Sequence, residues 1–286
     1  MNVKKLTLKS VSYPEVLRNI PSPPAQLYHA GQPLEQLLSR PRVAIVGSRR
    51  ITPYGRQVTA RLARELAEQG IIIISGLAFG VDYTAHEAAL EAGGTAIAVL
   101  PSPLDNIVPV SNRSLADKIL VQGGALVSEY ETGTHPVKQY FIARNRLVSG
   151  LADAVLITEA GEKSGSLHTY NFALEQGKTV LAVPGNITSS GSVGTNNLLK
   201  TGAVPVTSYL DVLHALGLED RATPRKIRGR NAHEQAILDL MQQGISEGHE
   251  LLDGSKLSVS EFNQSLTMLE IGSKIRPLGA NKWGIY

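Results

Sequence analysis

The residues best suited to chemistry lie in two glycine-containing turns that each carry a cation. Gly47-Ser48-Arg49 follows an apolar run, and Lys163-Ser164-Gly165-Ser166 precedes a helical pattern. Such turns offer main-chain N–H groups to an anion, and phosphate is the usual guest. Neither turn has the G-x-G-x-x-G spacing of a dinucleotide-binding site or the Walker lysine loop of a nucleoside triphosphatase. Two anion sites at one edge of the fold predict a ligand with several phosphates.

A third group combines a cation with an aromatic ring. Lys138 and Phe141 are one helical turn apart, and Arg144, Asn145 and Arg146 follow them. A lysine and a ring on one helix face suit a nucleic-acid strand, with a phosphate on the lysine and a base stacked on the ring. The residues alone favour the plainer alternative, in which Phe141 belongs to the core and the basic side chains form surface ion pairs.

The carboxylates give only weak support for catalysis. Asp82 is expected to cap a helix or to face its dipole, and His86, four residues later, is expected to satisfy a local hydrogen bond. Glu129 and Glu159 are expected to pair with nearby arginines, which would leave no general base. The sequence shows no cluster of metal ligands. We therefore expect a protein with no catalytic residue, no metal and no cofactor.

The apolar pattern predicts the scaffold that would bring these turns together. Val43–Val46 and Ile71–Ile74 are continuous apolar runs, typical of strands buried in a parallel sheet. Between them, Thr52 and Pro53 are suited to begin a helix as N-cap and first residue. Strands alternate with helices in this way to about residue 216. The pattern predicts an α/β domain with a doubly wound, mainly parallel sheet, which binds ligands at the carboxyl ends of its strands.

The last part of the chain has a different pattern. We expect short helices at Ala232–Gln242, Glu247–Leu252 and Ser258–Glu270, followed by a β-hairpin around Gly279. Three helices and a hairpin are typical of a winged-helix domain. The third helix contains two glutamates and no lysine or arginine, which disfavours DNA reading because phosphate contacts dominate DNA affinity. A protein-contact or structural module is the better prediction.

Charge and composition divide the chain into four parts. We expect a proline-rich lead-in packed on the main domain at 1–42, the α/β domain at 43–221, a basic linker at 222–230 and the winged helix at 231–286. The net charge of +3 divides into +2 for residues 1–221, +4 for the linker and −3 for the last part. The absence of cysteine excludes disulfides and thiolate metal sites. With no long apolar run, we expect no signal peptide, no membrane span and a cytoplasmic protein.

Many short motifs, in order along almost the whole chain, resemble the DNA-processing protein A (DprA/Smf) family. The motifs are AIVGSR (44–49), SGLAFGVDYTAH (75–86), FIARNRLVSGL (141–151), EKSGSLHT (162–169), VPGN (183–186) and GTNNLL (194–199). The chain departs from the family pattern in the loop after the third strand, where it has Pro101-Ser102-Pro103. Any role for that loop is therefore left open.

The resemblance implies a Rossmann-like domain that binds single-stranded DNA, forms a homodimer and loads the RecA recombinase in transformation or recombination. The DNA contacts that it implies, together with the neighbouring Asn145, are Gly47, Ser48, Arg49, Lys138, Phe141, Arg144, Asn145, Arg146, Lys163, Ser164, Gly165 and Ser166. Two alternatives stay open. One is a nucleotide-processing hydrolase with Glu129 or Glu159 as base, and the other is a sensor of a small phosphorylated ligand.

Overall fold

The computed structural model describes residues 2–220, 229–272 and 274–285, and most of the predicted linker, 222–228, lies outside them. The chain forms two compact units, Met1–Arg221 and Ala222–Tyr286, and their boundary coincides with the start of the predicted linker. Each unit is considered by itself.

Within the described residues of the first unit, nine strands form one sheet in the order β1-β2-β6-β5-β4-β3-β7-β8-β9. The pairs from β6 through β9 are parallel, which confirms the predicted mainly parallel α/β fold. The strands are β1 (Lys4–Thr7), β2 (Gln26–Gly31), β3 (Arg42–Gly47), β4 (Ile72–Ser75), β5 (Ala96–Leu100), β6 (Ala125–Ser128), β7 (Ala154–Glu159), β8 (Thr179–Ala182) and β9 (Val204–Pro205).

The N-terminal residues do more than pack beside this sheet. Strands β1 and β2 pair with each other, and β2 pairs with β6, both antiparallel. The short helices α1 (Glu15–Arg18) and α2 (Leu34–Leu37) follow these two strands. Leu17 and Leu27 are fully buried, and the Tyr13 hydroxyl donates to the carbonyl of Pro24 at 2.7 Å. The lead-in therefore belongs to the same core as the α/β domain.

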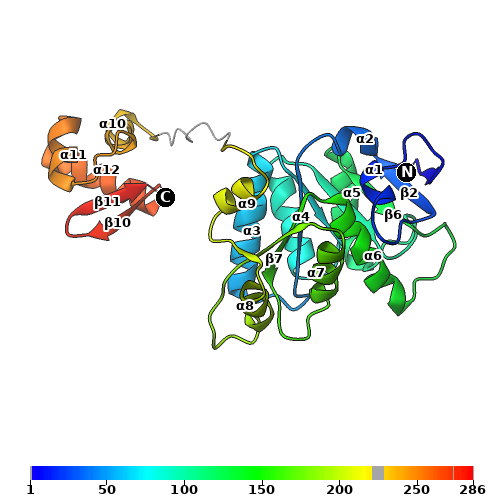
Figure 1. The fold of residues 1–286 in the computed structure, drawn as a ribbon. Coiled ribbons are helices and arrows are strands. Elements are labelled where there is room, and N and C mark those ends of the chain that lie inside the picture. Colours follow the sequence, from blue (N-terminus) through cyan, green and yellow to red (C-terminus); the bar gives the residue numbers. More distant parts are fainter. Residues whose placement is uncertain (1, 221–228, 273, 286) are drawn as a thin grey trace. The chain divides into compact units, whose positions relative to one another are not determined.

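Helices cover both faces of the sheet (Figure 1). In β3, Val43 and Ile45 pack with α3 and α4, whereas Ala44 and Val46 pack in the cluster that contains residues of α6 and α7. This alternation follows from the two-residue period of a strand and explains why residues 43–46 of β3 are all apolar. The helices are α3 (Pro53–Glu68), α4 (Val81–Glu91), the 3-10 turn η1 (Val110–Asn112), α5 (Arg113–Val121), α6 (Lys138–Leu151), α7 (Ser166–Glu175), α8 (Val193–Lys200) and α9 (Tyr209–Ala215).

Helix α3 begins as predicted. Its N-cap Thr52 accepts a hydrogen bond from the Gly55 amide at 3.1 Å, and Pro53 is the first helical residue. The first amides of a helix have no carbonyl partner within the helix. Proline has no amide hydrogen at that position, and the Thr52 hydroxyl accepts the hydrogen bond of a later amide, that of Gly55. These two residues fix where the chain leaves the β3 turn.

The described residues of the second unit form helices α10 (Ala232–Gln242), α11 (Gly248–Ser255) and α12 (Val259–Ile271) and the hairpin of β10 (Ile275–Gly279) and β11 (Lys282–Ile285). Ser258 and Glu261 form the capping box that begins α12. The order of elements is the predicted one, and the winged-helix assignment stays a prediction.

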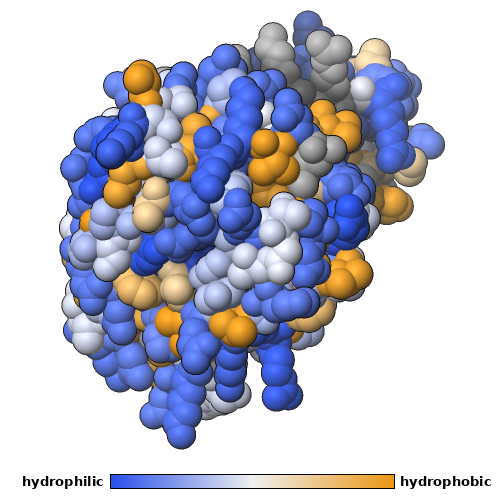
Figure 2. All heavy atoms as spheres, turned by 90° about the vertical axis from the view of Figure 1, so that its right-hand side faces the viewer, coloured by the Kyte–Doolittle hydropathy of each residue, from blue (hydrophilic) through white to orange (hydrophobic). Residues whose placement is uncertain are grey.

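The surface is mixed in character. On the face shown in Figure 2, hydrophilic side chains predominate and apolar residues occur in small groups, so that this face presents no large apolar docking patch. Within the described ranges, no helix combines the length and the apolar character needed to span a bilayer.

Candidate nucleic-acid interface

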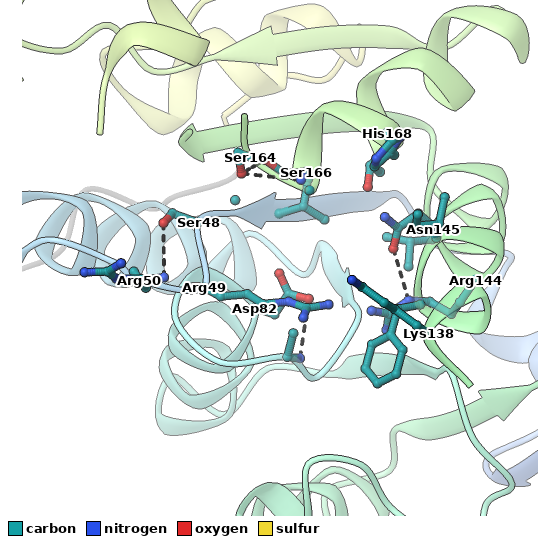
Figure 3. Close-up of a pocket in the computed structure, with 18 of the residues that line it drawn as sticks. Ser48, Arg49, Arg50, Asp82, Lys138, Arg144, Asn145, Ser164, Ser166 and His168 are labelled. Carbon is teal, nitrogen blue, oxygen red and sulfur yellow. Dashed lines mark hydrogen bonds between the residues drawn. The ribbon is translucent and has the colours of Figure 1, made fainter. Parts of the chain in front are cut away.

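A pocket of about 790 Å³ lies where the carboxyl end of β3 meets the start of α6 and the turn before α7 (Figure 3). Of the twelve predicted site residues, all except Arg146 line this pocket. Its volume is in the range that holds a drug-sized ligand or a nucleotide. The structure thus brings together both predicted anion sites and the predicted cation–aromatic group.

The β3 turn is held by main-chain contacts, and both of its arginines line the pocket. A Cβ on Gly47 would lie 2.6 Å from the Glu159 carbonyl oxygen, so that only glycine fits. The Ser48 amide donates to that same carbonyl at 2.8 Å, and the Ser48 carbonyl accepts from the Val81 amide at 3.1 Å. Arg49 and Arg50 follow on this fixed turn, and both are exposed.

Arg49 and Phe141 form the central feature of the pocket. The guanidinium carbon of Arg49 lies 5.2 Å from the centre of the Phe141 ring, within cation–π distance. Phe141 is half-buried and lines the pocket rather than the core, so the plainer alternative is wrong for this ring. Lys138 shares the pocket, but the cation over the ring is Arg49, because the β3 turn reaches across to α6. A base would find an ordered stacking surface there.

The second anion site is a small polar turn. Lys163 is exposed, and Ser164 and Ser166 approach each other at 2.8 Å between their hydroxyl oxygens (Figure 3). A Cβ on Gly165 would meet nothing within 4 Å, so the main chain there is open to a ligand. Neither Lys163 nor Lys138 forms an ion pair with an acidic side chain of the described residues.

Arg144 lies in the pocket floor and acts as a clamp. It is 3% exposed, and its guanidinium donates to the carbonyls of Gly76, after β4, and Val99, in β5. Asp82 accepts from the amides of Gly76 at 3.0 Å and Ala78 at 3.4 Å, so it supports this loop instead of capping α4. Burial lowers the pKa of Arg144 to about 10, although the negative charge of Asp82 acts in the opposite direction and raises it. Arg144 therefore fixes α6 to the sheet and has few donors left for DNA.

Arg146 and the two glutamates lie outside the pocket. Arg146 forms the predicted ion pair with Glu129, at 2.6 Å. The corresponding prediction for Glu159 is wrong: its carboxylate accepts from the Thr52 amide at 3.1 Å and from the Thr52 hydroxyl, because it lies beside the start of α3. Neither glutamate is placed to act as a base on a ligand in the pocket.

The residues that line the pocket beyond the predicted ones include two with basic side chains, Arg50 and His168. Arg50 is visible in the sequence beside Arg49, whereas His168 gave no signal beyond its place in the first turn of α7. Among the described lining residues, Asp82 is the one carboxylate. The described ranges contain no group of three or more His, Asp or Glu side chains that could hold a metal ion.

Comparison with known proteins decides the family. The model of the family described as DNA recombination-mediator protein A matches residues 4–217. The chain belongs to this family. It is similar to the DNA processing protein DprA of Bacillus subtilis, 39% identical over 215 residues, which are 75% of this chain and 71% of that protein. Protein Smf of Escherichia coli is 45% identical over 175 residues, 61% of this chain and 47% of that protein.

Solved structures agree with this membership. The fold is similar to DNA processing protein A of Streptococcus pneumoniae, with a TM-score of 0.69 at 39% identity over 76% of this chain and 75% of that one. DNA processing protein A of Helicobacter pylori, described for its single-stranded DNA binding mode, gives a TM-score of 0.66 at 39% identity over 74% of this chain and 95% of that one. The predicted resemblance is confirmed. The family match ends before the second unit.

Proposed function

We propose that the chain binds single-stranded DNA in this pocket, largely without regard to sequence, and acts as a recombination mediator. The observation that carries the proposal is the Arg49–Phe141 pair in a pocket that two exposed lysines, Lys138 and Lys163, also line. An aromatic plane accepts any base, and cations accept phosphate whatever the sequence. The membership of the family and the relative described for single-stranded DNA binding support the same conclusion.

Each site residue has a role in this proposal. A base stacks on Phe141 beside Arg49, and phosphates bind Lys138, Lys163 and the amides and hydroxyls of the turn at 164–166. Gly47 and Ser48 shape the opposite wall, and Asn145 offers an amide from α6. Arg144 and Arg146, which the sequence predicted as DNA contacts, support the site from below and beside it.

The wider proposal follows the family resemblance. The protein is a cytoplasmic homodimer that delivers single-stranded DNA to the RecA recombinase during transformation or recombination, and it has no catalytic activity of its own. The second unit is a winged helix that contacts protein. Two of the cations of its hairpin, Lys274 and Lys282, are paired with Glu234 and Glu247, which leaves less charge for a DNA backbone.

One alternative function keeps a specific observation in its favour. The pocket volume of about 790 Å³ suits a free nucleotide, which could make the protein a sensor. A nucleotide that raises the melting temperature more than an oligonucleotide does would favour that function. The hydrolase alternative loses both of its predicted bases, since Glu129 and Glu159 lie outside the pocket.

The test is fluorescence anisotropy of a labelled oligo-dT across a salt series, with duplex as competitor. We expect preference for the single strand, and we expect Arg49→Ala and Lys163→Ala each to weaken binding and to reduce the log–log salt slope by about 0.7. Arg64→Ala is the matched control, because Arg64 is paired with Glu91 at 3.0 Å and does not line the pocket. Unchanged affinity in both pocket variants would overturn the assigned site.

A further inference from the structure

A second surface continues from the pocket over the loop between β4 and α4. In that loop Ala78 lines the pocket, and the next residue, Phe79, is 51% exposed. A ring with half of its surface in water contributes little to the core of its own chain. Stacking on a nucleobase is the contact for which such a ring is best suited, because every base presents a π face.

Arginines accompany this ring without acidic partners. Arg49, Arg50 and Arg56 are exposed, and none forms an ion pair with an acidic side chain of the described residues. Further along α3, by contrast, Arg61 is paired with Glu65 at 2.9 Å and Arg64 with Glu91 at 3.0 Å. The arginines without an acidic partner among the described residues therefore lie in the β3 turn and the first turn of α3.

Hydrogen bonds join the arginine turn and the Phe79 loop into one surface. The Val81 amide, two residues after Phe79, donates to the Ser48 carbonyl at 3.1 Å. The Arg50 amide donates to the Ser48 hydroxyl at 3.1 Å. The side chain of Arg50 extends away from Lys138 and Arg144, toward the outside of the pocket (Figure 3). The surface is thus continuous with the pocket and leads away from α6.

Arg56 belongs to α3, the helix that is paired with α4. The two helices pack against each other along their lengths. Arg56 is exposed in the first turn of α3, and Phe79 is exposed two residues before α4. The cation and the ring therefore lie at the starts of two helices that pack against each other.

We propose that single-stranded DNA leaves the pocket across this surface, with a second base stacked on Phe79 and phosphates on Arg50 and Arg56. The inference rests on the proposed function, because it assumes that a DNA strand occupies the pocket. Its support is the continuity with the pocket and the charge complementarity to a phosphate backbone. It assigns the strand a path from α6 over the starts of α3 and α4.

Oligonucleotides of two lengths test this path. An oligo-dT of about four nucleotides fills the pocket, and one of about sixteen also covers the Phe79 surface. We expect Phe79→Leu, which keeps apolar bulk but removes the ring, to weaken binding of the long oligonucleotide about fivefold and to leave the short one unchanged. Phe79→Trp should restore the loss, and Arg56→Ala should lower the salt slope for the long oligonucleotide by about 0.7.

The outcomes separate this inference from the proposed function. Arg64→Ala is again the control, and it should leave both lengths unaffected. If Phe79→Leu binds the long oligonucleotide like the wild type while Arg49→Ala weakens both, the pocket stands and the second surface is wrong. Equal loss of both lengths in Phe79→Leu would also refute the path, since the ring would then act on the pocket itself. If the wild type binds neither length, the proposed function fails first.

Discussion

Replacing Arg144 distinguishes a structural clamp from a DNA contact. Arg144→Met keeps the length of the side chain but leaves the carbonyls of Gly76 and Val99 without their donor and Asp82 without its neighbouring cation. Each buried acceptor left unsatisfied costs about 1–3 kcal/mol, and the buried Asp82 keeps its two amide donors but loses the nearby positive charge. Because these terms overlap, we expect the free energy of unfolding of the first unit to fall by about 3–5 kcal/mol, a large part of a typical total.

The chain carries its own internal control for this measurement. Its one tryptophan, Trp283, lies in β11 of the second unit, so tryptophan fluorescence reports that unit alone, whereas circular dichroism reports both. In a urea titration of the full chain, Arg144→Met should shift the dichroism transition and leave the fluorescence transition in place. Adding Asp82→Asn should cost less than the sum of the single changes, since the two groups interact.

The competing explanation predicts a different result. If Arg144 contacted DNA directly, Arg144→Met would weaken binding of oligo-dT in conditions where the protein is fully folded, with a stability loss below about 1 kcal/mol. That combination would refute the clamp. Measuring affinity and stability on the same variant therefore decides between the two roles.

Three further predictions concern other parts of the structure. Gly76→Ala should destabilise the first unit by about 2–4 kcal/mol in urea, because the added Cβ would overlap the Arg144 guanidinium; a loss below about 0.5 kcal/mol would contradict the clamp geometry. Ser258→Ala removes the capping box of α12 and should lower stability by about 1 kcal/mol in the Trp283 fluorescence transition. Burial lowers the pKa of His86 to about 4. Between about pH 6.5 and 4 this imidazole is therefore protonated in the unfolded chain and neutral in the folded chain. Stability should thus fall from about pH 6.5 to 4, by at most about 1.4 kcal/mol per pH unit from this group, and an equally steep fall in His86→Gln would exclude His86 as the cause.

The sequence predicted the elements with strong local signals. The strand at Val43–Val46 and the helix that starts after Thr52 were found because burial on both faces and a capping pair leave a direct pattern in the residue order. Strands β1 and β2 were missed, since strands of four to six residues carry no such pattern; β2 gains its place by pairing with β6, and β1 by pairing with β2.

At the site, the sequence predicted which turns converge but not what each cation does there. Arg49 over Phe141 and Glu159 on Thr52 join residues about 90 to 110 positions apart, and their pairing depends on the order of the strands. Arg144 and Arg146 are two residues apart on one helix, yet one is buried under the pocket and the other is paired with Glu129. Only the direction in which each side chain leaves α6 separates these roles.

The two outermost strands of the sheet limit how the protein can associate with copies of itself. Strand β1 carries the exposed residues Lys4 and Lys5, and β9 has only two residues, the second of which is Pro205 without an amide hydrogen. Charged, very short or proline-containing margins resist the addition of another strand. Two copies of this chain are therefore not expected to fuse their sheets into one continuous ladder. The homodimer that we propose would form through side chains of helices and loops, so each copy would keep its own sheet and its own pocket.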